Sequence, residues 1–213
     1  MKELQGRPAI RHVDVLGMVE IGNTAAGYFA LDAMVKAAPV RIVSVRTVHP
    51  GKLLIFFTGD VASVEAAVKA GTAAAGDDMM DRLLLPRAHE SLIEALDSAL
   101  DSGVNGTAAN AGRTWDAVGI IDAATVAAGI ECADRAVKET GVEIALIRFD
   151  DAMGGRVSIR FSGTLHDIEA AVETAASLLE TNGRLVRRTI IANPHPDMVG
   201  TLDARGNEQG GRA

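Results

Sequence analysis

The sequence predicts an α+β protein made of two similar domains in tandem. A segment that begins at Leu16 returns in related form at Val118, a shift of 102 positions. The shift grows to 106 between His89 and His195, and it grows only between expected elements, where loops accept insertions most easily. Within each copy, β-rich runs and helical periodicity alternate in the order β-α-β-β-α-β.

The first copy supplies four expected strands and two expected helices. Thr24 is placed to cap the first helix, whose small apolar residues recur at helical spacing until Pro39 stops it. Asp60 is placed to cap the second helix, and a Pro-Gly pair marks the turn between the two middle strands. The strands are expected at residues 16–21, 41–46, 53–58 and 82–86.

The second copy repeats this order, with Thr125 and Thr164 at the cap positions. Asp167 lies three residues after Thr164, a spacing that resembles a capping box. Between the copies, an amphipathic helix begins at Ser91 and runs into a Gly/Asn/Ala-rich segment. The predicted division is a first domain at 14–104, a linker at 105–116, a second domain at 117–199 and a flexible polar tail at 200–213.

Composition narrows the function classes. Apolar residues make up 48% of the chain and aromatic residues only 3%, so Ala, Val, Ile and Leu are expected to build the cores. The formal charge of −7 argues against nucleic-acid and membrane-surface partners. The single cysteine, Cys132, excludes an internal disulfide and suits a reducing compartment, and no apolar stretch approaches bilayer length. We therefore expect a cytoplasmic protein in which Cys132 packs as a small buried hydrophobe.

Several motifs occur in order and twice. The first half contains VEIGNTAAGYFALDAMVKAAPVRIVSV, GDVASVEAAVKAG and PRAH, and the second contains VGIID, CADRAVK, FSGTLHDIEAAV and NPHPD. Together these motifs resemble the shell domain of bacterial microcompartments (the BMC domain) over about residues 14 to 199. Both halves begin with the strand that opens the domain, so the chain resembles the unpermuted tandem type. It is most similar to the propanediol-utilisation tandem shell proteins that carry an iron–sulfur cluster.

The resemblance implies a fold, an assembly and a role. Each half would be a ferredoxin-like BMC domain, and three two-domain chains would close a pseudohexameric trimer of six domains. The protein would be a structural, non-enzymatic tile of a microcompartment shell. Its partners would be two further copies of itself, other shell proteins at the tile edges, and small metabolites that pass through a central pore.

The resemblance also implies which turns face the axis. The family's cluster-bearing turn has the form T-x-C-P-G-K, and here His49 stands in place of the cysteine. An iron–sulfur cluster is therefore not expected, because thiolates hold such clusters. Three converging imidazoles could instead hold a metal ion, or form a ring that gains charge as pH falls. The implied pore-lining residues are His49, Pro50 and Gly51 from the first turn and Asp151, Ala152, Met153 and Gly154 from the second.

Two lysines recur at equivalent helix ends. Lys36 and Lys138 each follow an aspartate by four residues, and a cation at a helix end is favoured by the helix dipole alone. The resemblance implies a further role, because this lysine meets the neighbouring tile in the family. Arg87, in PRAH, is implied to support the same edge.

A second class of function stays open at this point. A ferredoxin-like scaffold could equally serve a soluble small-molecule-binding or electron-transfer trimer, since this fold hosts many functions. The sequence carries no phosphate-binding G-x-x-x-x-G-K-[ST] loop and no Ser/His/Asp grouping near a turn, which favours the structural role.

Overall fold

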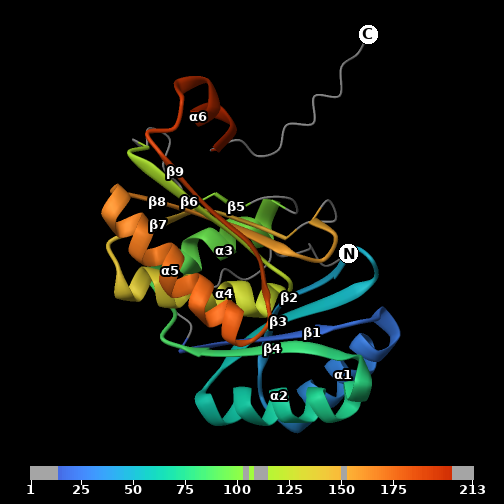
Figure 1. Cartoon of the computed structure of the whole chain (residues 1–213). Coiled ribbons are helices and arrows are strands. Elements are labelled where there is room, and N and C mark those ends of the chain that lie inside the picture. The colour runs from blue at the N-terminus through green and yellow to red at the C-terminus, as the bar shows by residue number, and fades with distance from the viewer. Residues whose placement is uncertain (1–13, 103–105, 108–114, 150–152, 203–213) are drawn as a thin grey trace, which may run out of the picture.

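The computed structural model describes residues 14–102, 106–107, 115–149 and 153–202 (Figure 1). The first half comprises β1 (Val15–Ile21), α1 (Thr24–Ala37), β2 (Arg41–Val48), β3 (Lys52–Gly59), α2 (Val61–Ala75), the 3-10 turn η1 (Gly76–Asp78) and β4 (Met79–Pro86). Next come α3 (Glu90–Ser102) and β5 (Gly106–Thr107). The second half comprises β6 (Ala117–Ala123), α4 (Val126–Glu139), β7 (Glu143–Arg148), β8 (Val157–Gly163), α5 (Leu165–Thr181), β9 (Leu185–Ala192) and α6 (Pro196–Leu202).

Each half folds around one antiparallel sheet. The strand orders are β2-β3-β1-β4 and β5-β7-β8-β6-β9, so the second sheet repeats the first and adds β5 at one edge. The registers repeat as well, because Gly17 lies opposite Phe57 and Gly119 lies opposite Phe161. The predicted tandem of β-α-β-β-α-β domains is confirmed.

Helix starts follow the predicted capping chemistry with one exception. The carboxylate of Asp60 accepts from the Ser63 N–H, and the hydroxyls of Thr125 and Thr164 accept from the N–H groups three residues on. The prediction that Thr24 caps α1 is wrong. Asn23, the counterpart of Thr125, is the cap, because its side-chain oxygen accepts from the Ala26 N–H at 2.8 Å while its backbone stays extended.

The first sheet is covered on both faces, and only one cover comes from its own half. Residues such as Val19 and Phe57 pack with α1 and α2 in one cluster. Their neighbours along the same strands, such as Met18 and Phe56, point to the opposite face, as the two-residue period of a strand requires. There they share a core with residues of α3 and α4, and Figure 1 shows α4 lying between the two sheets. The two halves are therefore joined through a common hydrophobic core.

Two segments differ from the predicted linker and tail. A linker is predicted at 105–116, and within it Gly106–Thr107 pairs with Leu146 and Ile147 of β7 and Trp115 is buried. The tail was expected to begin at residue 200, but α6 continues to Leu202, whose side chain packs with Trp115 and Val118. Strand pairing and the buried Trp115 give the first segment its order, and the buried Leu202 anchors the end of the second. Residues 203–213 lie outside the described part of the chain.

Candidate functional site: two turns and the junction between the halves

The first candidate turn connects β2 to β3. His49 and Pro50 are exposed and are joined by a cis peptide bond. Gly51 adopts φ 113°, a conformation that favours glycine, and its N–H donates to the Val48 carbonyl at 2.9 Å. The tight turn therefore presents the His49 imidazole at the end of the hairpin.

The second candidate turn connects β7 to β8 and is only partly described. Met153 is half-buried, Gly154 is exposed and Gly155 is buried. Asp151 and Ala152, which were expected to line the pore with them, lie outside the described residues. Their contribution to a pore rim stays a prediction.

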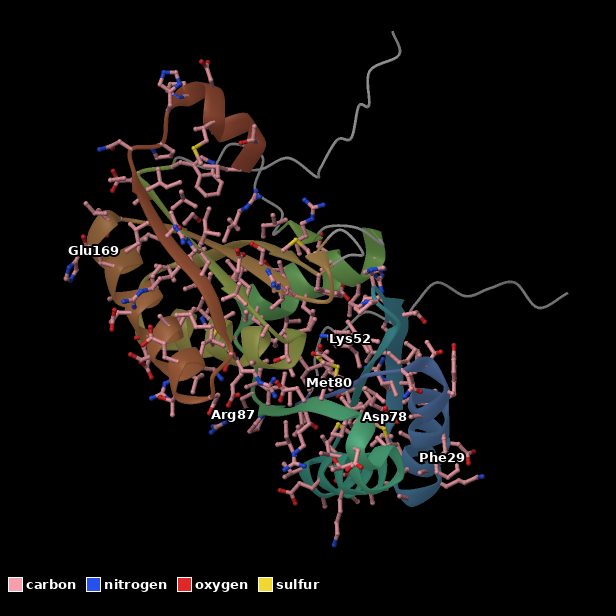
Figure 2. All side chains as sticks on the ribbon, turned by 45° about the vertical axis from the view of Figure 1, so that its right-hand side comes forward. Phe29, Lys52, Asp78, Met80, Arg87 and Glu169 are labelled. Atoms are coloured by element: carbon pink, nitrogen blue, oxygen red, sulfur yellow. The ribbon has the colours of Figure 1, made fainter. Side chains whose placement is uncertain are left out.

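The structure brings the two turns side by side. The Lys52 ammonium donates to the Gly155 carbonyl at 2.8 Å, which ties the first hairpin to the second loop. A Cβ atom added to Gly155 would lie 2.8 Å from the backbone oxygen of His49, so only glycine permits this approach. Figure 2 shows Lys52 in this position, between the two halves.

A buried ion pair anchors the same junction. Glu20 is completely buried, and its carboxylate accepts from the Lys52 ammonium at 2.7 Å and from the Val126 N–H at the start of α4 at 2.8 Å. Burial raises the pKa of Glu20, while the hydrogen bond and charge of Lys52 act in the opposite direction. The positive end of the α4 dipole also favours the carboxylate. Glu20 thus links β1, the first turn and the second half.

Further polar contacts hold the second half against β4. The guanidinium of Arg184 lies 3.6 Å from the Asp81 carboxylate and donates to the Met80 carbonyl at 3.0 Å. The Thr125 hydroxyl, which caps α4, also donates to Asp81. At the far end of β4, the His89 N–H donates to the Asp134 carboxylate at 2.7 Å.

Sequence reasoning missed this junction network. In the sequence, Glu20 was noted only as part of a motif and Lys52 only as the last residue of a turn. The available signal was that both charged residues adjoin runs of apolar strand residues, where an ionised group needs a partner. That partner could not be identified without the fold.

The two predicted edge lysines occupy equivalent last turns of α1 and α4. Lys36 pairs with Asp32 at 2.5 Å, and its side chain is 73% exposed. Lys138 pairs with Asp134 at 2.5 Å, and its side chain is 38% exposed. Asp134 also accepts from the His89 N–H of the first half. An exposed pair of this kind contributes less than about 1 kcal/mol to stability, so Lys36 is free to serve another contact.

Arg87 lies at the end of β4 with its backbone in the left-handed region, at φ 51°. Its N–H donates to the Asp14 carbonyl at 3.1 Å. The equivalent Asn193 has φ 45° and donates in the same way to the Asp116 carbonyl at 2.7 Å. Both halves therefore close with the same turn, which leaves the Arg87 side chain exposed at a surface position (Figure 2).

The donor set does not fit an iron–sulfur cluster. Cys132, the single cysteine of the chain, lies inside the shared core on α4, and its thiol donates to the Gly129 carbonyl at 3.1 Å. Burial raises the pKa of this thiol far above its ordinary value, which opposes formation of the thiolate that a cluster needs. Within the described residues of one chain, no group of three or more His, Cys, Asp or Glu side chains could hold a metal ion.

Across the described part of the chain, no helix combines the length and the apolar character that a membrane crossing requires.

The comparisons identify the class of protein that this arrangement defines. The BMC domain model matches twice, at residues 15–88 and 117–194, one match in each half. The chain therefore belongs to the BMC-domain family of bacterial microcompartment shell proteins.

Relatives of the same tandem length are among the matches. The bacterial microcompartment shell protein PduT of Citrobacter freundii is 36% identical over 183 residues, which are 86% of this chain and 94% of PduT. The shell protein EutM of Salmonella typhimurium is 39% identical over 84 residues, which are 38% of this chain and 88% of EutM. A solved microcompartment protein from Desulfitobacterium hafniense superposes with a TM-score of 0.71 and 31% identity, covering 88% of this chain and 99% of that one.

Proposed function

We propose that this shell protein is a structural tile built as a trimer, with a pore where the paired turns meet. One observation carries the proposal: the two BMC domains of one chain already pack side by side through a defined junction, with both turns at the same place. If the second domain packs on the first domain of the next chain in the same way, three chains place six domains around an axis. The polar groups at the described junction serve ion pairs and the cap of α4, which supports a structural rather than a catalytic role.

The purified protein should sediment as a trimer of roughly 67 kDa, three times the chain mass of 22.2 kDa, and should form flat sheets in electron micrographs. A stable monomer or tetramer would exclude the ring.

Lys36→Ala should leave the trimer intact and reduce sheet formation, since Lys36 would donate across the edge to a neighbouring tile. Lys69→Ala, which removes an exposed lysine from α2, is the matched control and should form sheets normally.

The His49 turn would line the pore in three copies. Small metabolites would pass between this turn and the loop at 153–155, and three neutral imidazoles at the axis would suit one transition-metal ion. Calorimetry with Zn²⁺ should show one ion bound per trimer, and His49→Ala should abolish this binding without loss of fold, because an exposed turn side chain adds little to the core. Equal binding by both proteins would reduce His49 to an ordinary pore-lining residue.

A further inference from the structure

The two equivalent helices of the repeat are buried very differently. Ten residues of α4 are buried, but only Gly27, Ala30 and Met34 of α1 are. The difference arises because α4 is covered on two sides, by its own sheet and by strands β1 and β4 of the first half. In α1 the corresponding outer side is open, where Tyr28 is 58% exposed and Phe29 is 65% exposed. Figure 2 shows Phe29 on the outside of α1.

The second sheet is left uncovered at the matching place. Strand β4 is partly buried along most of its length under α4, whereas its counterpart β9 is exposed at every position from 186 to 190. Arg187 and Thr189 lie on the open face there, whereas Arg188 between them points to α5. Helix α6 covers the neighbouring part of the same sheet, around Val118 and Ala145. The chain therefore carries one open helix, α1, and one open strand, β9. Their counterparts in the repeat, α4 and β4, cover each other at the junction within the chain.

This symmetry favours a second copy of the chain as the partner that covers the open helix and the open strand. The registers make the comparison exact at the residue level: Asp81 lies opposite Glu20 in the first sheet, and Arg187 lies opposite Asp122 in the second. One residue before each strand stand Asp78 and Arg184. Within a chain, Arg184 of the second half pairs with Asp81 of the first half. In the equivalent contact between two chains, Asp78 would replace Arg184 and Arg187 of the next chain would replace Asp81.

We propose that α1 and η1 of one chain dock on the open β9 face of the next chain, and that a charge-reversed ion pair, Arg187 with the partner's Asp78, sets this contact. The inference rests on the proposed trimer and specifies its interchain contact. At both positions the side-chain charge has the opposite sign in the contact between chains and in the junction within a chain. Each contact therefore still joins opposite charges, with the two charges exchanged. Both side chains belong to exposed residues, which leaves them available for pairing.

Other junction contacts have counterparts of suitable chemistry. Asp122 stands in place of Glu20, where it can accept from the N-terminus of the partner's α1. Arg156 stands in place of Lys52 and can donate to the carbonyl of the partner's Gly51.

Two residues of α1 also have counterparts at the junction. Asp32 stands in place of Asp134, where it would face the N–H of the partner's His195. Phe29 stands in place of Glu131, so its ring would meet the guanidinium of Arg187.

The inverted polarity also excludes wrong neighbours. A second domain docked on another second domain would bring Arg184 against Arg187, and a first domain docked on another first domain would bring Asp78 against Asp81. Like charges at both wrong junctions enforce the alternation of first and second domains around the ring.

The test is a charge swap measured by sedimentation equilibrium. Arg187→Glu and Asp78→Arg should each weaken trimer association by about 10-fold or more at low salt, because each places like charges together. The double variant Arg187→Glu/Asp78→Arg should recover most of the wild-type association. Arg188→Gln is the matched control, because Arg188 pairs with Glu173 of α5 at 2.8 Å on the other face of the sheet, and it should associate normally.

The outcomes separate the two levels of the proposal. A wild-type protein that never forms a trimer would overturn the proposed tile itself. A wild-type trimer whose association is unchanged by the single variants, or not recovered in the double variant, would overturn the charge-reversed contact and leave the tile standing. Circular dichroism of each variant should show an unchanged fold, since both residues are exposed.

Discussion

Replacing Glu20 by alanine should lower the free energy of unfolding by about 3–5 kcal/mol. The substitution leaves the Lys52 ammonium, which is buried at the junction, without its carboxylate. It also removes the acceptor of the Val126 N–H at the start of α4. An uncompensated buried charge is far more costly than the net contribution of an intact pair. Urea unfolding followed by circular dichroism, at one fixed protein concentration, would measure the loss.

A double substitution provides the control for this prediction. Glu20→Leu combined with Lys52→Met replaces both charges by apolar side chains of similar size, and it should recover most of the lost stability. The double variant would still lack the hydrogen bond to Gly155, so the second turn should be less well held even when the fold is stable. If Glu20→Ala cost no more than about 1 kcal/mol, the pair would not be the anchor of the junction.

Phe56→Ala should lower the free energy of unfolding by a similar amount, about 3–5 kcal/mol. The Phe56 ring is fully buried in the core shared by the two halves, with its centroid 5.9 Å from that of Phe149 at the start of the second loop. Removing it opens a cavity at the junction and ends the contact between the rings. Thermal or urea unfolding gives the measurement.

Phe56→Leu is the graded control, because it keeps most of the apolar volume. Its expected cost is about 1 kcal/mol. Equal losses for the two variants would indicate that the ring contact with Phe149, rather than the filled volume, carries the stability. A negligible loss for Phe56→Ala would show that the halves are not joined through this core.

Local patterns predicted most of the fold, because the repeat tests each element twice. Periodicity placed the strands and helices, and Asp60 and Thr125 cap the expected helices. Thr24 failed as a cap because Asn23 next to it offers an equally good acceptor, and comparison with Thr125 would have chosen Asn23. The polar composition of the linker and the tail did not indicate that Trp115 and Leu202, one apolar residue from each, pack in one cluster.

The junction could not be predicted from the sequence, because it joins residues about a hundred positions apart. Glu20 and Val126, or Lys52 and Gly155, have no local signal that pairs them. The resemblance to the family indicated two axis-facing turns, and the described parts of those turns do lie together. It did not indicate how one half holds the other.

The junction within each chain has a consequence for how the proposed trimer should respond to dilution. Its two surfaces are joined covalently, so they meet at a fixed effective concentration, whatever the amount of protein in solution. Only the contacts between chains obey mass action. A ring of six separate domains would have six contacts sensitive to dilution, whereas three such chains would have three. On dilution, the trimer should therefore dissociate into single chains, each with its internal junction intact. Reassembly should then begin from these two-domain chains rather than from single domains.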